Sequence, residues 1–260
     1  MTIAMTTTQP SRQQAAPRPR ARLVCRWLLA LLLAPAGLAA PLAQAGNPIA
    51  DPYLQARRQM VDQIRQQGIT QPAVLRAMEL VPRHLFVPEE YRQRAYADEP
   101  VPIGSGKSIY QPYMVALMTE LLDLDGKEKV LEIGTGSGYH TAVLSRVARE
   151  VYTVEIDEPL GKKALKTLAT VGYHNIWVHI GDGYNGWPSE APFDAIILTA
   201  APPYVPQPLI DQLKIGGKMV IPVGNFLQDL QVLTKTEHGV ETRKVGPVRV
   251  PAMTGEAQDR

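Results

Sequence analysis

The sequence predicts an α/β protein with a doubly wound, mostly parallel sheet of seven strands, preceded by a helical N-terminal extension. Two observations predict this fold. From Lys129 onward, short β-prone runs alternate with segments of helical apolar spacing, as in a parallel sheet covered by helices on both faces. The first run, KVLEI, continues into alternate glycines in LEIGTGSGYH, which is typical of a strand that leads into a ligand-binding turn.

The beginning of the 260-residue chain differs from the rest. It contains five arginines and no acid, and its apolar run at 27–45 ends in AQA, the small-x-small pattern of a secretory cleavage site. The run is too short to remain as a membrane-spanning helix. We therefore expect a leader at 1–45 and one compact domain at 46–260. In that domain, N-terminal helices and a loop at 46–110 precede a sheet-containing core at 111–260.

Charge and composition exclude several classes of protein. Outside the leader, 22 basic residues face 25 acidic residues, a net charge of −3 that argues against a nucleic-acid-binding surface. The single cysteine, Cys25, lies in the leader, so the rest of the chain has no disulfide, cysteine nucleophile or thiolate metal site. The five histidines show no metal-binding spacing, and we expect no metal.

The N-terminal extension is expected to hold two helices and a long loop. Asp51 and Pro52 form a favourable helix start, and Gly68 is a favourable end. A second, shorter helix is expected at 70–80. The segment 81–110 is rich in proline and glycine and predicts a long irregular loop, which in a compact domain is usually functional or disordered.

The remaining elements follow from apolar periodicity and from the glycines and prolines between the runs. Helices are expected at 111–124, 141–148, 159–172 and 206–217. Strands are expected at 129–133, 151–157, 175–180, 193–200, 218–224, 229–236 and 244–253. The C-terminal GEAQDR is expected to fray.

The glycine spacing argues against two common ligands. A dinucleotide fingerprint would need its third glycine where Tyr139 stands. A phosphate-binding loop would need Gly-Lys-Ser/Thr, which is absent. The E-x-G-x-G-x-G pattern instead resembles the first motif of S-adenosylmethionine-dependent methyltransferases, whose cofactor has no phosphate. On that resemblance, the cofactor-binding residues of the turn are Glu132, Gly134, Thr135, Gly136, Ser137 and Gly138.

Two further strand ends support a nucleoside cofactor. The next strand ends in Glu155, where an acid accepts hydrogen bonds from ribose hydroxyls. The third strand is followed by Asp182 and Gly183, placed to meet the adenine amino group. Taken singly, Glu155 is equally well explained as a helix cap and Asp182 as a turn former. Three such features at consecutive strand ends favour the cofactor.

Longer segments carry a more specific resemblance, from about Arg57 to Met253. VPRHLFVPEEYRQRAYAD, PIGSGKSIYQPYMVALMTELL, VLEIGTGSGYHTAVLS and PFDAIILTAAP resemble the protein-L-isoaspartate O-methyltransferases. The resemblance implies a Rossmann-like methyltransferase fold and the use of S-adenosylmethionine. It also implies methylation of the free α-carboxylate of isoaspartyl residues in damaged proteins, which starts repair through a succinimide.

The resemblance also assigns an acceptor site. Tyr110 stands where the family's proposed active-site serine belongs, and Ser108 replaces a threonine. A phenol still donates a hydrogen bond but is far bulkier than a serine. Tyr110 therefore takes over the serine's contact, swings away, or alters the pocket. The other expected substrate positions are Ile109, Gln111, Pro112, Ala200, Ala201 and Pro202.

Several alternatives remain at this point. Tyr110 leaves open a related carboxylate or small-molecule methyltransferase, and a protein that binds cofactor or isoaspartyl peptide without turnover. A nicotinamide-dependent oxidoreductase is disfavoured by the missing third glycine. The leader predicts export to the periplasm, whereas the cytoplasmic cofactor favours the cytoplasm. We expect damaged proteins or peptides as partners, no nucleic acid, no membrane span in the mature chain, and a monomer.

Overall fold

A computed structural model describes residues 51–259, which form one compact unit. The predicted leader at 1–45, with Cys25, lies outside the described residues. Within the described range, no helix combines the length and apolar character needed to cross a membrane.

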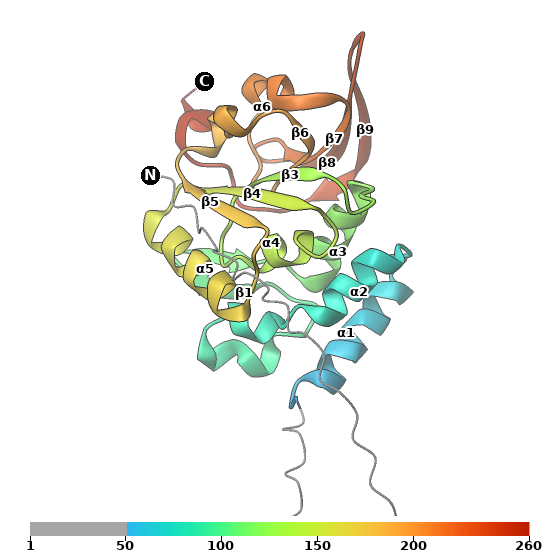
Figure 1. Cartoon of the computed structure of the whole chain (residues 1–260), viewed down its shortest axis with the longest axis vertical. Coiled ribbons are helices and arrows are strands. Elements are labelled where there is room, and N and C mark those ends of the chain that lie inside the picture. Colours follow the sequence, from blue (N-terminus) through green and yellow to red (C-terminus); the bar gives the residue numbers. More distant parts are fainter. Residues whose placement is uncertain (1–50, 260) are drawn as a thin grey trace, which may run out of the picture. The chain divides into compact units, whose positions relative to one another are not determined.

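A seven-stranded sheet forms the centre of this unit (Figure 1). Its strands are β3 (Lys129–Ile133), β4 (Glu150–Glu155), β5 (Ile176–Ile180), β6 (Phe193–Leu198), β7 (Leu213–Val223), β8 (Gln228–Thr236) and β9 (Gly239–Val248). The order across the sheet is β5-β4-β3-β6-β7-β8-β9. Neighbours from β5 to β7 are parallel, whereas β8 is antiparallel to both β7 and β9. The predicted mostly parallel sheet is confirmed.

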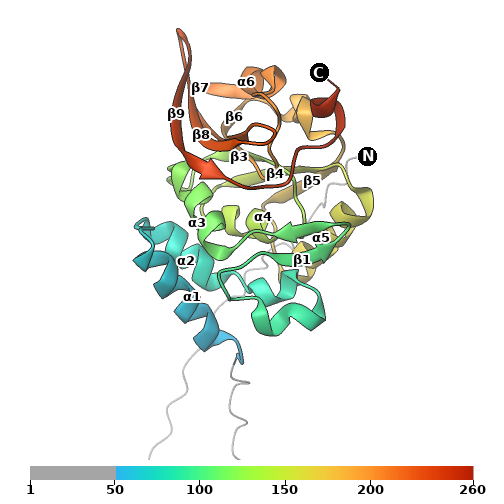
Figure 2. The same ribbon diagram turned by 180° about the vertical axis from the view of Figure 1, so that it is seen from behind.

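Helices lie on both faces of the sheet, as predicted (Figure 1). One face carries α3 (Pro112–Leu121), α4 (Tyr139–Leu144) and α5 (Glu158–Val171), and the other carries α6 (Gln207–Gln212). The N-terminal extension consists of α1 (Leu54–Gln66) and α2 (Pro72–Leu80), which pack against α3 and α4 on the side away from the sheet (Figure 2). The first face is therefore covered by two helical layers.

The central strands are buried on both faces. Successive side chains of a strand point to opposite sides. In β6, Ala195 and Ile197 join the apolar cluster under α3 to α5, whereas Ile196 and Leu198 join the cluster on the α6 side. Burial on both sides explains why these strands are continuous apolar runs in the sequence.

The structure corrects the predicted end of the last helix. A helix was expected over 206–217, but α6 ends at Gln212 and β7 already begins at Leu213. Leu213 is buried and pairs with Phe193 at the start of β6. Sheet pairing with a segment that is distant in the sequence overrides the local helical spacing.

The segment 81–110 is more regular than predicted. It forms two 3₁₀ helices, Arg83–Phe86 and Glu89–Arg94, and then a hairpin of β1 (Val101–Gly104) and β2 (Lys107–Ile109). Its prolines and glycines mark the bends between these short elements.

The C-terminal segment was expected to fray, but its described residues do not. Gly255–Gln258 forms a 3₁₀ helix, and Ala257 is fully buried. The amide of Glu256 donates to Oδ2 of Asp182 at 2.7 Å. Gly255–Gln258 is thus fixed beside the turn that follows β5.

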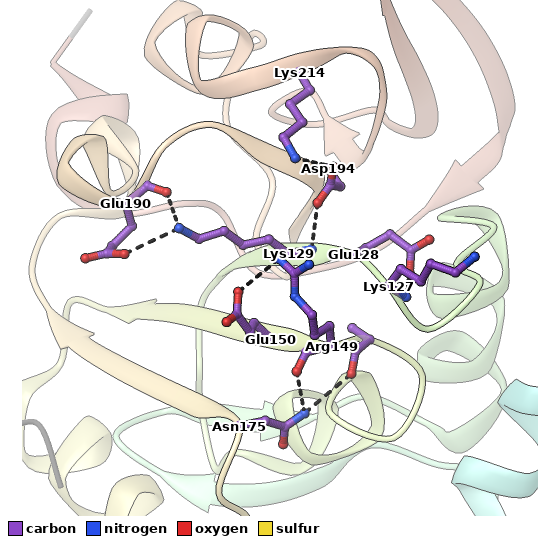
Figure 3. Close-up of polar contacts among 10 residues, drawn as sticks. Lys127, Glu128, Lys129, Arg149, Glu150, Asn175, Glu190, Asp194 and Lys214 are labelled. Carbon is purple, nitrogen blue, oxygen red and sulfur yellow. Dashed lines mark hydrogen bonds and ion pairs between the residues drawn. The ribbon is translucent and has the colours of Figure 1, made fainter. Parts of the chain in front are cut away.

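Charged side chains are paired at the amino-terminal edge of the sheet (Figure 3). Asp194, near the start of β6, accepts hydrogen bonds from the amide of Lys129 at 2.8 Å and from Nζ of Lys214 at 2.5 Å. The Lys129 ammonium also lies 3.4 Å from the carboxylate of Glu190. These contacts join the strand starts at the edge opposite the glycine turn, so Asp194 has a structural role.

Candidate active site

A cavity of about 320 Å³ opens at the carboxyl edge of the sheet, where β3 and β4 end. The glycine turn after β3 lines it together with the β1–β2 hairpin, Tyr110 and residues 251–254. Open α/β sheets bind ligands at this edge, and the volume suits a small organic ligand. The structure therefore brings the glycine turn and the predicted acceptor loop to one cavity.

Backbone conformation explains the glycines of the turn. Gly134, Gly136 and Gly138 have φ values of +99°, +57° and +86°, which favour glycine. A Cβ atom on Gly134 would lie 2.2 Å from Oγ1 of Thr199. That hydroxyl is held 2.8 Å from the carbonyl oxygen of Gly134. Gly134 and Gly136 line the cavity with backbone alone, since they have no side chain. Thr135 and Ser137 also line the cavity.

Glu155 lies at the end of β4, lines the cavity and is only 2% exposed. Its Oε2 accepts a hydrogen bond from the amide of Gly136 at 2.8 Å. Its Oε1 accepts from the amide of Asp157 at 3.0 Å and from Nζ of Lys107 at 3.1 Å. A carboxylate offers about four acceptor positions. A ligand that donates two hydrogen bonds to Glu155 must therefore displace Lys107.

Glu132 lies behind the glycine turn and does not line the cavity. It is fully buried, and its Oε2 accepts hydrogen bonds from the hydroxyls of Thr141 and Thr153. The Thr153 hydroxyl is 2.7 Å from that of Thr135 in the turn. Gly138 is also outside the cavity and caps α4 in a left-handed conformation. Both residues hold the turn in place.

Asp182 and Gly183 lie at the turn after β5, and only Gly183 lines the cavity. The two oxygens of Asp182 accept hydrogen bonds from the amides of Tyr184 and Glu256 at 2.9 and 2.7 Å. A Cβ atom on Gly183 would lie 2.3 Å from Cγ2 of Ile133. The structure thus gives Asp182 the contacts of a turn former beside the cavity.

Tyr110 closes one side of the cavity. Its hydroxyl donates a hydrogen bond to the carbonyl oxygen of Thr199, and burial raises the pKa of this phenol. Its own carbonyl accepts from Nη2 of Arg83 at 2.7 Å. A phenol has one proton to donate. In this arrangement that proton is used in the cavity wall and is not offered to an acceptor.

The other predicted substrate positions divide into two groups. Those that line the cavity with Tyr110 are Ser108, Ile109 and Ala200. Those outside the lining are Gln111, Pro112, Ala201 and Pro202. Gln111 and Pro112 stand at the start of α3, and Ala201 and Pro202 follow the lining residue Ala200 along the chain.

His140 has a defined tautomer. The hydroxyl of Thr119 donates to the carbonyl of Val115 at 2.7 Å, so its oxygen must accept the proton on Nε2 of His140, 3.0 Å away. The other ring nitrogen, Nδ1, is buried without a hydrogen-bond partner. Burial lowers the pKa of His140 to about 3, so the ring is neutral. His140 thus lines the cavity as a neutral ring whose Nδ1 atom is itself buried.

Sequence reasoning missed two basic residues. Lys107 reaches the carboxylate of Glu155 from the β1–β2 hairpin. Arg83 is fully buried without a carboxylate partner, and its Nε donates to the carbonyl of Ala95 at 2.6 Å. Because Arg83 also binds the carbonyl of Tyr110, it fixes the acceptor loop. The sequence signal that could have identified these residues is their place in two distinctive segments, Arg83 in VPRHLFVP and Lys107 in IGSGKSIY.

Glu132 predicts a specific pH dependence of stability. Burial raises its pKa from 4.5 to about 8, against the opposing effect of the Thr141 and Thr153 hydroxyls. Its contribution to stability is complete below pH 4.5 and is lost between pH 4.5 and 8, because only the unfolded state releases the proton in that range. Denaturant unfolding of the wild type and Glu132→Gln should therefore diverge by up to about 1.4 kcal/mol per pH unit. Parallel pH profiles of the two proteins would contradict this account.

The fold and the cavity together define a class of protein. A mostly parallel sheet with a glycine turn after β3 and an acid at the end of β4 is the arrangement of a Rossmann-like, S-adenosylmethionine-dependent methyltransferase. Among residues 51–259, no group of three or more His, Cys, Asp or Glu side chains is arranged to hold a metal ion. The chain belongs to the protein-L-isoaspartate(D-aspartate) O-methyltransferase (PCMT) family, whose sequence model matches residues 55–258.

Individual relatives agree with this membership. The chain is 53% identical over 208 residues to protein-L-isoaspartate O-methyltransferase 2 of Shewanella sediminis, covering 79% of this chain and 85% of the relative. A solved protein-L-isoaspartate O-methyltransferase is 27% identical with a TM-score of 0.70, covering 77% of this chain and 67% of that one. A Plasmodium falciparum structure in complex with S-adenosyl-L-homocysteine shares the fold, with 23% identity, a TM-score of 0.67, and coverage of 76% and 98%. The predicted family and fold are confirmed.

Proposed function

We propose that the protein transfers a methyl group from S-adenosylmethionine to the free α-carboxylate of L-isoaspartyl residues in damaged proteins. The resulting ester starts repair through a succinimide. Family membership and the relatives support this activity. The observation that carries the proposal is that the glycine turn, Glu155 and the acceptor loop with Ser108 and Tyr110 line one cavity. Cofactor and acceptor can therefore meet there.

Three features of the cavity fit this cofactor. The bare backbone at Gly134 and Gly136 allows close approach of the ligand. The carboxylate of Glu155 can accept from ribose hydroxyls. The His140 ring that lines the cavity is neutral, so it places no positive charge near the sulfonium. Since the cofactor has no phosphate, no basic phosphate-binding loop is needed.

The residues of the chain need to position the reactants and exclude water. When bound, S-adenosylmethionine supplies an electrophilic methyl group on a positively charged sulfonium. The acceptor carboxyl has an ordinary pKa of roughly 3.3–3.9, so it is already ionised at neutral pH and needs no general base. The glycine turn holds one side of the cavity, and the loop with Ser108 holds the other. Tyr110 and Arg83 fix this loop by their hydrogen bonds, which favours a constant geometry of approach.

Methyl transfer to paired peptides tests the proposed function. One peptide carries an L-isoaspartyl residue, and its twin carries an ordinary aspartyl residue at the same position. We expect base-labile methyl ester on the first peptide alone. Equal labelling of both peptides would point to another carboxylate methyltransferase. Cofactor binding by calorimetry without any ester would point to a protein that binds without turnover.

Tyr110→Phe should remain active. The ring still closes the cavity, and the change removes only the hydrogen bond to the carbonyl of Thr199. Loss of one such bond costs about 0.5–1.5 kcal/mol, which corresponds to about 2- to 12-fold, and we expect kcat and cofactor affinity to fall by no more than this. Steady-state kinetics and calorimetry measure both, with Tyr113→Phe on α3 as the matched control. A 100-fold loss in kcat at unchanged cofactor affinity would show that the Tyr110 hydroxyl contacts the acceptor.

We further propose that the protein is exported to the periplasm and acts as a monomer. The apolar run at 27–45 and its AQA ending support export, and the cavity walls that one chain provides support a monomer. Mass spectrometry of the purified protein should find Gly46 as the first residue, whereas an intact N-terminus would favour the cytoplasm. Light scattering during size-exclusion chromatography should give the mass of one chain.

A further inference from the structure

Two large apolar side chains project from the turn between β7 and β8. Phe226 and Leu227 are 102% and 91% exposed, more than any other large apolar residue in the described part of the chain. Both belong to the short turn Gly224–Leu227, which follows the last residue of β7. Water contact over two adjacent large apolar side chains is unfavourable unless something covers them.

The turn is held firmly at both ends. The amide of Gly224 donates to the carbonyl of Pro202 at 3.0 Å. Immediately after the turn, the buried Gln228 donates to the carbonyl of Val250 at 3.0 Å and accepts from the amide of Val250 at 2.8 Å. The side chains of Phe226 and Leu227 therefore project from a fixed backbone.

These anchors place the turn beside the cavity. Pro202 follows the cavity-lining residue Ala200 by two positions, and Val250 directly precedes the cavity-lining residue Pro251. In addition, β7 is parallel to β6, so its last residue lies at the carboxyl edge of the sheet, as the glycine turn does. The pair formed by Phe226 and Leu227, here called the apolar tip, therefore extends from the same edge of the sheet as the cavity.

We propose that the apolar tip binds the substrate polypeptide next to its isoaspartyl residue and selects segments with apolar neighbours. This inference rests on the proposed function, because a polypeptide acceptor must pass the rim for its carboxylate to enter the cavity. Successive side chains of an extended chain alternate in direction, so residues flanking the acceptor can contact the tip while the acceptor points inward. Damaged, partly unfolded proteins expose such apolar segments.

The size of the tip favours a peptide over a second protein subunit. A stable protein interface buries about 800 Å² on each partner, whereas one large aromatic side chain contributes roughly 150–250 Å². Two adjacent side chains between the polar residues Asn225 and Gln228 are too small for such an interface. They are sufficient for one or two side chains of a peptide.

Kinetics with two isoaspartyl peptides test the proposal. One peptide has valine, leucine and phenylalanine around the isoaspartyl residue, and the other has glycine and serine there. In Phe226→Ser/Leu227→Ser, we expect KM for the apolar peptide to rise about 5- to 20-fold. We expect kcat, cofactor affinity and KM for the glycine peptide to stay the same. Fluorescence anisotropy of both labelled peptides measures binding without requiring turnover.

Ile215→Ser is the matched control. Ile215 is 64% exposed and lies near the start of β7, towards the opposite edge of the sheet. Its substitution should leave both peptides unaffected. The proposal is overturned if the double substitution changes KM equally for both peptides or changes KM for neither. It is also overturned if the double variant differs from the wild type only in oligomeric state or in binding to anionic lipid vesicles. If the wild type binds the apolar peptide through the tip but forms no ester, the proposed function fails and the binding inference stands.

Discussion

Glu155→Gln is expected to weaken the binding of S-adenosylmethionine by about 10- to 100-fold, since a hydrogen bond to a charged group contributes about 1.5–3 kcal/mol. The carboxylate accepts from the amides of Gly136 and Asp157 on its two oxygens. An amide side chain has only one oxygen, so its NH₂ group must face one of these N–H donors in either orientation. The substitution therefore removes one oxygen of the proposed ribose acceptor and sets an N–H donor against the amide of Gly136 or of Asp157.

Isothermal titration calorimetry measures this loss, with Glu158→Gln as the control. Glu158 is an exposed acid three positions along the chain, and it pairs with Lys162 within α5. The Glu158→Gln variant should bind cofactor as the wild type does, and thermal unfolding should show that both variants are folded. Unchanged affinity in Glu155→Gln would remove Glu155 from the cofactor site.

Gly134→Ala is expected to destabilise the fold by about 2–5 kcal/mol and to abolish measurable cofactor binding. Positive φ costs a residue with a Cβ atom about 1–2 kcal/mol, and insertion of a methyl group into a packed site costs about 1–3 kcal/mol. The new methyl group would lie 2.2 Å from Oγ1 of Thr199, which is also bound to the turn itself. Relief of this overlap would move the cavity wall.

Gly172→Ala separates the two contributions. Gly172 ends α5 with φ of +91°, close to the +99° of Gly134, but a Cβ atom there would meet nothing within 4 Å. Urea unfolding should show only the conformational cost for Gly172→Ala and a larger cost for Gly134→Ala. In Gly134→Ala/Thr199→Ala, part of the difference should be recovered. Equal costs at the two glycines would show that the overlap with Thr199 is easily relieved.

The order of the core elements was predictable because the central strands are buried on both faces. β6 is apolar at every position except Asp194, and β3 has the β-prone run Val130, Leu131 and Ile133, so their sequences identify them without knowledge of their partners. The end of α6 was not predictable in the same way. Leu213 has the spacing of a helical residue and becomes a strand residue only because Phe193 is available for pairing.

The candidate site was predictable to the extent that backbone conformation decides it. Glycine at 134 and 136 indicates positive φ and close approach, which are local properties. By contrast, Glu132 and Asp182 were predicted to bind cofactor, and the structure places both outside the cavity lining, in contacts with Thr141 and Tyr184. An acidic residue gives the same signal in the sequence whether its side chain binds a ligand or another part of the protein.

The sequence by itself determined the sheet, the glycine turn, the family and the acidic strand end at Glu155, because these depend on residue type and local periodicity. Only the tertiary structure decided that Lys107 pairs with Glu155, that Tyr110 donates to Thr199, and that the turn with the apolar tip is anchored to the chain beside cavity-lining residues. These contacts join residues far apart along the chain. A side chain's partner depends on distances set by the whole fold, which no local pattern encodes.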